Sequence, residues 1–170
     1  MKRPHSLVLG CGIVALAILF NGMAAFAGST TATLTINATV SSRAELTLSP
    51  TSITFPDASP TSSPTVAANS TVAVTANVRT ASTSTATLTA LANGDLVSGS
   101  NTIPISNVTW TATPSPFIAG TMNKTTAQSA ATFSAGSGSY SGTYTFSMAN
   151  SWSYNTGSYS QTVTYTLTAP

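Results

Sequence analysis

Apolar and polar residues alternate along most of this chain, with a repeat of two residues rather than the 3.6 of a helix. The clearest example is the run from Thr31 to Val40, where hydroxyl or amide residues occupy every second position. The intervening apolar positions are Ala32, Leu34, Ile36, Ala38 and Val40. Successive side chains of a strand point to opposite faces, so this run predicts a β-strand with one dry and one wet face.

Similar alternation predicts strands along the rest of the chain, separated by turn signals. The runs are 44–48, 52–55, 72–78, 86–90, 103–112, 131–133, 144–148 and 159–168. Proline-rich stretches at 56–69 and 113–124 predict loops, and 93–95 and 98–101 predict tight turns. We expect an irregularity near Pro104 or Asn107, where the alternation changes face. About eight or nine short strands at this spacing are typical of an all-β, antiparallel sandwich.

Residues 1–27 have the pattern of a secretory signal peptide. Lys2 and Arg3 precede an apolar stretch, and Ala25-Phe26-Ala27 is a small-x-small cleavage pattern. An uncleaved membrane anchor is the competing interpretation, but a spanning helix needs about 20 apolar residues and this core is shorter. We interpret Cys11 as an apolar residue of the signal, because the hydrophobic stretch continues past it. The protein is therefore expected to be exported.

Removal of this signal would change the charge of the chain. The whole sequence has a formal net charge of +2, but Lys2 and Arg3 belong to the signal. The remaining chain would carry three cationic side chains, Arg43, Arg79 and Lys124. It would also carry three carboxylates, Glu45, Asp57 and Asp95, so its formal net charge would be zero. With no net charge and no basic stripe, the mature chain has no electrostatic basis for binding nucleic acid.

The residues left after cleavage also give little support for catalysis. The single histidine and the single cysteine both lie in the signal, so neither a histidine base nor a thiol nucleophile remains. Lys124 has no recognisable catalytic pattern around it, and Asp95 in Asn93-Gly94-Asp95 is more typical of a turn than of a calcium site. We expect no enzymatic activity, no cofactor and no metal.

Aromatic residues offer a second kind of candidate site. Trp110 continues the apolar face of Val108 and Ala112, so we assign it to the core. Trp152 and Tyr154 lie in a predicted loop between Asn150 and Asn155, and they are candidates for contact with a surface or a glycan.

Three parts of the chain resemble a known family. They are the alternating run directly after Ala27, the stretch Leu46-Thr47-Leu48-Ser49-Pro50-Thr51-Ser52-Ile53-Thr54-Phe55, and the ending that runs from Gly157 and Tyr159 to Thr168. Together they resemble the pilin-like β-sandwiches of archaic chaperone–usher fimbriae, which have a spore-coat-protein-U-type domain. Two features differ from that family: no cysteine pair follows residue 27, and Pro56 stands where a glycine commonly follows the phenylalanine.

This resemblance implies an incomplete immunoglobulin-like sandwich in a fimbrial subunit involved in adhesion. On that basis, residues 1–27 form the signal peptide, 28–41 the candidate donor strand and 42–170 the sandwich domain. The donor strand would fill the gap in the next subunit, with the five apolar residues of the first run inserted into its core. The implied partners are copies of the same chain joined head to tail, a periplasmic chaperone and an outer-membrane usher.

The residues alone leave an alternative open. Thr31–Val40 could instead be the first strand of its own domain, which would then be a self-complete, monomeric secreted module that binds a surface or a glycan through Trp152 and Tyr154.

Overall fold

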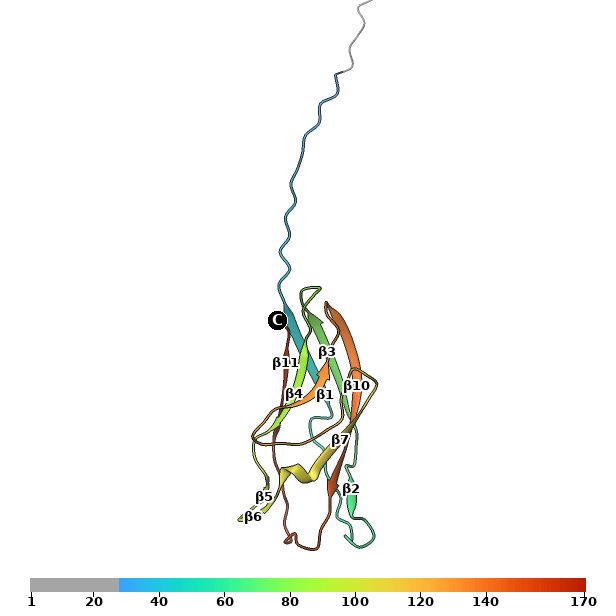
Figure 1. Ribbon diagram of the computed structural model, residues 1–170, viewed down its shortest axis with the longest axis vertical. Coiled ribbons are helices and arrows are strands. Elements are labelled where there is room, and N and C mark those ends of the chain that lie inside the picture. Colours follow the sequence, from blue (N-terminus) through green and yellow to red (C-terminus); the bar gives the residue numbers. More distant parts are fainter. Residues whose placement is uncertain (1–27) are drawn as a thin grey trace, which may run out of the picture. The chain divides into compact units, whose positions relative to one another are not determined.

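Antiparallel β-strands make up the folded part of the chain (Figure 1). The computed structural model describes residues 28–170, so the predicted signal peptide at 1–27 lies outside the described residues. Residues 39–170 form one unit with its own core. The predicted all-β class with antiparallel sheets is confirmed.

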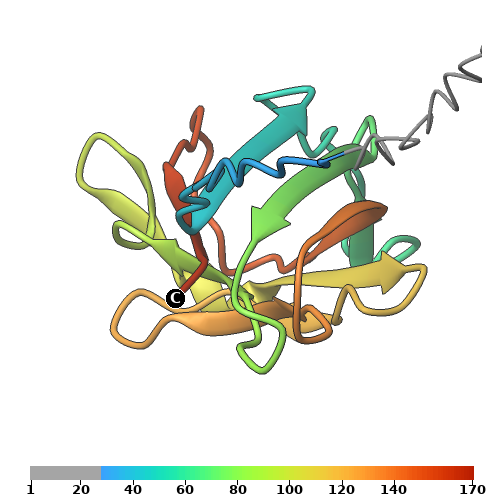
Figure 2. The ribbon, with the colours of Figure 1, turned by 90° about the horizontal axis from the view of Figure 1, so that it is seen from above.

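Two sheets pack against each other around this core, and Figure 2 shows them from above. The first sheet has the order β1 (Arg43–Ser49), β3 (Val72–Arg79), β10 (Gly138–Ala149), β7 (Val108–Thr113) and β8 (Gly120–Thr121), and β2 (Thr65–Ala67) also pairs with β10. The second sheet has the order β11 (Val163–Thr168), β4 (Thr87–Ala92) and β9 (Gln128–Thr132). A separate hairpin consists of β5 (Leu96–Ser98) and β6 (Asn101–Ile103).

The predicted alternation places the core residues of both sheets. In β3 every second residue is buried, and β4, β7 and β10 follow the same rule. The largest fully buried side chains are Trp110, Tyr144, Phe133, Leu88 and Val74. Trp110 is 2% exposed, which confirms its assignment to the core, and its indole Nε1–H donates to the carbonyl oxygen of Ile118 at 2.8 Å.

Two of the predicted breaks between strands, a turn and an irregularity, are present in the structure. The turn between β5 and β6 contains Gly99 with a φ of 58°, a left-handed conformation that glycine adopts without a steric penalty. The expected irregularity in 103–112 is a short 3-10 helix, Ile105–Asn107, between β6 and β7. Among residues 28–170 we find no helix with the length and hydropathy that a membrane span requires.

Several predicted elements differ from the structure. The run 52–55 is not a strand, because the backbone N–H of Thr54 donates to the side chain of Asn69 at 2.9 Å and its carbonyl accepts from the N–H of Asn69 at 2.8 Å. One residue thus occupies both backbone groups that a ladder would use. The predicted loops 56–69 and 113–124 each contain a short strand, β2 and β8. The last strand begins at Val163 rather than at Tyr159.

Candidate interaction surfaces

The N-terminal segment, residues 28–41, has no strand in the structure. The strand predicted for Thr31–Val40 is therefore absent from the single chain. Leu34 and Ile36 are each 84% exposed and Val40 is 69% exposed, which makes them three of the most exposed large apolar side chains among the described residues. Ala32 and Ala38 are exposed too. Several aliphatic side chains in one exposed row carry an unfavourable hydration free energy that burial against a partner would relieve.

On one side of the sandwich, two strands each have a backbone edge without a partner. Within the described residues, β11 pairs with β4 alone and β1 pairs with β3 alone. These two strands belong to different sheets but lie against each other at one side of the sandwich, as the red and cyan ribbons of Figure 2 show. We call this side, with the unpaired edges of β1 and β11, the open side. An unpaired strand edge presents N–H and C=O groups that can pair with another chain.

Apolar residues on the open side are only half-buried. They point inward and contact the core, yet all remain partly exposed, unlike the inward residues of β3. The set comprises Leu46, Leu48, Val163, Tyr165 and Leu167. The core is therefore incompletely covered between β1 and β11.

Tyr165 is the aromatic residue of this open side. Its ring stacks on Tyr144 of the opposite sheet, and burial raises the pKa of its hydroxyl above the ordinary value of 10.0. Burial also raises the pKa of Tyr144, with a smaller contribution from Tyr165 nearby. The hydroxyl of Tyr144 donates to the carbonyl oxygen of Ala130 at 2.8 Å. Both phenols are thus held neutral well into alkaline conditions, which suits a packing role.

The chain enters β1 beside a pocket of about 370 Å³. Arg79, the last residue of β3, donates its Nε–H to the carbonyl oxygen of Ser41 at 2.8 Å and holds the start of the domain in place. The pocket is lined by Val40, Ser41, Ser42, Arg79, Thr80, Ala81, Ser137 and Pro170. Since the start of β1 and the residues after β11 meet here, β1 and β11 run in opposite directions.

The loop between β10 and β11 places Trp152 and Tyr154 in different surroundings. Trp152 is 75% exposed, and its indole Nε1–H donates to the hydroxyl of Thr61 at 3.1 Å. The hydroxyl of Tyr154 accepts from the side-chain amide of Asn107 at 2.7 Å and donates to the carbonyl of Ala149 at 3.2 Å. Trp152 therefore offers an exposed ring, whereas Tyr154 fastens its loop to the sandwich.

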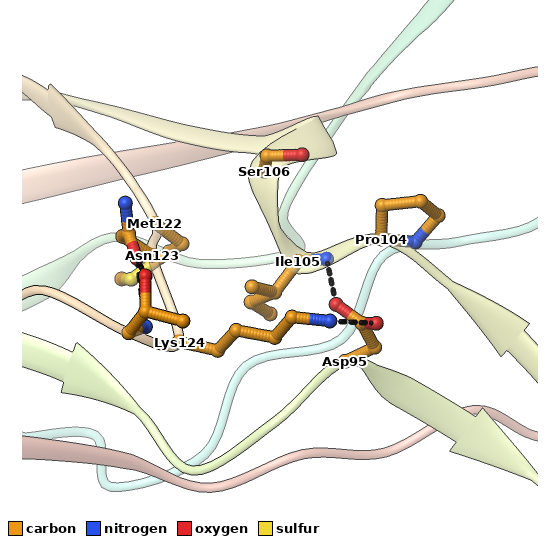
Figure 3. A pocket seen from close by; sticks show the side chains of 8 residues that line it. Asp95, Pro104, Ile105, Ser106, Met122, Asn123 and Lys124 are labelled. Carbon is orange, nitrogen blue, oxygen red and sulfur yellow. Dashed lines mark hydrogen bonds and ion pairs between the residues drawn. The ribbon is translucent and has the colours of Figure 1, made fainter.

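A second pocket, of about 200 Å³, lies beside Asp95 (Figure 3). One carboxylate oxygen of Asp95 accepts from the backbone N–H of Ile105 at 3.0 Å, and the other pairs with Nζ of Lys124 at 2.5 Å. These two hydrogen bonds, with Lys124 first, hold the pKa of Asp95 below its ordinary value. The carbonyl of Asp95 also accepts from Gln161 at 2.8 Å. Asp95 thus joins four segments of the chain, and each of its carboxylate oxygens accepts one hydrogen bond.

The described residues 28–170 contain no group of three or more His, Cys, Asp or Glu side chains placed to hold a metal ion. Comparison with protein-family models gives no match, and comparison with curated proteins gives none either.

The sequence singled out the N-terminal segment and Trp152 as candidates, and the structure shows that both are exposed, whereas the open side was found only in the structure. Openness between β1 and β11 depends on which strands neighbour each other in the folded sheets. No local pattern encodes that order. In the sequence, the half-buried residues of β11 have the same alternation as the inward face of any other strand. They differ from other inward residues only in that the structure leaves them partly exposed to solvent.

Proposed function

We propose that this protein is the exported structural subunit of a surface fibre, assembled by addition of its N-terminal segment to the open side of a second copy. The observation that carries the proposal is the coexistence of two unsatisfied surfaces on one chain. Leu34 and Ile36 are exposed in a segment of strand-like alternation, and β11 has an unpaired edge above half-buried apolar residues.

The strand order supports an incomplete immunoglobulin-like topology. A seven-stranded immunoglobulin sandwich places strands A, B, E and D in one sheet and C, F and G in the other. The order β1-β3-β10-β7 corresponds to the first sheet, and β4 next to β11 corresponds to C and F. The strand that would follow as G, beside the free edge of β11, has no counterpart in residues 28–170. An added strand would take that place.

The N-terminal segment has the chemistry that this place requires. Its backbone can pair with the free N–H and C=O groups of β11, as in other cases of β-strand addition. Its five apolar residues, Ala32, Leu34, Ile36, Ala38 and Val40, fall on one face and would cover the half-buried residues of the open side. Full burial of each large aliphatic side chain contributes about 1.5–3 kcal/mol. The threonine face would remain in water.

Addition to a second copy explains the short connection better than addition within the same chain. Since only Ser41 and Ser42 separate Val40 from β1, a segment that folded back onto its own domain would have to turn through two serines. Two-residue hairpin turns favour Asn-Gly, Asp-Gly or a glycine at the first position, because they need positive φ values. A head-to-tail contact has no such requirement, and repetition of it gives an open fibre.

Transport before assembly would leave the open side uncovered. An exposed apolar edge is prone to uncontrolled pairing. We therefore include in the proposal a chaperone that covers β11 in the periplasm, and an usher that exchanges it for the next subunit. No catalytic step is needed, because strand addition makes and breaks only noncovalent contacts.

Mature chain 28–170 and a synthetic Thr31–Val40 peptide provide the test. We expect the chain alone to form concentration-dependent oligomers in analytical ultracentrifugation, and excess peptide to convert them into peptide-bound monomers. A control peptide with Leu34 and Ile36 both replaced by Thr keeps a high strand propensity but loses its two largest apolar side chains, and it should not compete. A monomer in which the amides of 31–40 are protected from hydrogen exchange would contradict the proposal and indicate a self-complete domain.

A further inference from the structure

Two charged side chains of the sandwich have no ionic partner. Residues 28–170 contain six charged side chains, of which Arg43 pairs with Glu45 at 3.1 Å and Lys124 pairs with Asp95 at 2.5 Å. Asp57 and Arg79 are left, and both are exposed. One carboxylate and one guanidinium of the sandwich are thus available to pair with charges on another molecule.

Asp57 lies at the end of the sandwich where β11 starts. Its loop, 56–64, follows β1 and is fastened to the loop after β10, because the side chain of Asn150 donates to the carbonyls of Ala58 at 3.0 Å and Ser63 at 3.1 Å. Trp152 bonds to Thr61 of the same loop. Figure 1 shows these loops together at the lower end of the sandwich. Asp57 and the exposed indole of Trp152 therefore share one end, which we call the tryptophan end.

Arg79 lies at the opposite end, where β1 starts. Arg79 lies opposite Arg43, the first residue of β1, in the pairing of β1 with β3. Its Nε–H donates to the carbonyl oxygen of Ser41, the residue that follows Val40. Arg79 and Ala81 line the 370 Å³ pocket there, which we call the entry pocket. The cation is thus fixed beside the link that connects the N-terminal segment to its own domain.

The direction of the added strand decides which ends meet. Every strand pair in the described residues is antiparallel, and antiparallel pairing is slightly the more stable per residue. A segment antiparallel to β11 places Val40 at the end where β11 starts. Ser41 and Ser42 can then span only about 10 Å before the next domain begins at Arg43. The entry pocket of the donating copy must therefore lie close to the tryptophan end of the receiving copy.

We propose that Asp57 and Trp152 of one copy contact the entry pocket of the next copy, with Arg79 paired to Asp57 and placed against the indole of Trp152. This inference rests on the proposed function, since strand addition brings the two ends together. Opposite charges complement each other across the contact. Guanidinium groups bind the faces of tryptophan rings, and Trp and Arg are enriched among the residues that dominate interfaces. The contact would set the angle between successive subunits and limit their rotation about the serine link.

Charge exchange between the two ends tests this contact on the mature chain 28–170. Asp57→Arg and Arg79→Asp should each weaken oligomerisation, raising the concentration of half-assembly about tenfold. The double variant with both changes should restore it to within about threefold of the wild type. Both side chains are exposed, but Arg79→Asp also removes the bond to Ser41, so circular dichroism of each variant checks that the domain still folds. Thr111→Arg and Thr145→Asp are matched controls, because they alter exposed positions within β7 and β10, away from both ends.

Fluorescence of Trp152 gives an independent readout, since Trp110 is already buried. Oligomerisation should shift the emission to the blue, and Trp152→Phe should abolish the shift. The Thr31–Val40 peptide brings no entry pocket, so the peptide-bound monomer should have the same emission as the free monomer. If oligomers form and the peptide binds, but neither the charge variants nor the emission respond, the contact is overturned while the proposed function stands. If the peptide does not bind, the proposed function fails first.

Discussion

The ring of Tyr165 stacks on the ring of Tyr144, with centroids 6.1 Å apart and planes 18° apart. Tyr165 lies on β11, at the edge of one sheet, and Tyr144 lies on β10 in the centre of the other. This pair ties an edge strand to a fully buried residue across the sandwich. It explains how β11 stays in position although one of its edges is unpaired.

Removal of the Tyr165 ring should destabilise the domain. Tyr165→Ala deletes a stacked, half-buried ring, and we expect a loss of about 2–4 kcal/mol in the free energy of unfolding, measured with urea. Tyr165→Phe preserves the stack and should change stability by less than about 1 kcal/mol. Equal stability of the Ala and Phe variants would show that the ring does not anchor β11.

Alkaline conditions should destabilise the fold through the same two tyrosines. Their pKa values are raised in the folded state relative to 10.0, so ionisation is easier in the unfolded chain. The two neutral phenols contribute their full share to the free energy of unfolding below about pH 10. This share is lost as the pH rises toward the pKa values of the folded state. Thermal unfolding between about pH 8 and pH 11 should show this loss, and Tyr165→Phe should reduce it without abolishing the share of Tyr144. A flat profile over this range would argue against buried neutral phenols.

Acid should destabilise the fold through Asp95. Its folded-state pKa lies below the ordinary value of 3.8, so the stabilisation is present above that value and is lost as the pH falls through the folded-state pKa. Asp95→Asn should lower the melting temperature at about pH 7, and the difference from the wild type should shrink toward about pH 2. Lys124→Gln is the matched comparison, and its effect should be smaller because the bond from Ile105 remains. A pH-independent difference for Asp95→Asn would contradict this origin.

An added methyl group at Gly142 should disrupt the core. Gly142 is buried in β10, and a Cβ built there would collide with the ring of Phe117, which packs edge-on against both Phe133 and Tyr144. Because three aromatic rings would have to shift, Gly142→Ala should cost about 1–3 kcal/mol in denaturant unfolding. Gly99→Asn is a useful contrast, because that position has open space and asparagine tolerates its positive φ. A neutral Gly142→Ala would mean that the Phe117 ring moves freely.

Local alternation predicted the core of this fold because each strand is buried on one face. It identified the inward residues of β3 and β10 and the irregularity before β7. It was wrong at 52–55, where the pattern suits a strand but Asn69, distant in sequence, occupies the backbone groups. The charged pairs could not be predicted either, since Asp95 and Lys124 meet only when four segments converge. The sequence located most of the longer strands, but it did not show which strands are neighbours in the sheets.

Strand addition should depend on the apolar face of the N-terminal segment and not on its threonine face. In the chain 28–170, Leu34→Asp together with Ile36→Asp would place two carboxylates against the half-buried residues of the open side. Burial of an unpaired charge is strongly unfavourable, so we expect assembly to be lost over the accessible concentration range.

Thr33→Asp together with Thr35→Asp is the matched control, because it adds the same charge on the wet face. That control should assemble within about tenfold of the wild type. Sedimentation velocity measures both variants, and their thermal unfolding should match the wild-type monomer, because the segment is exposed there. Equal loss of assembly in both variants would indicate nonspecific charge repulsion rather than an inserted apolar face.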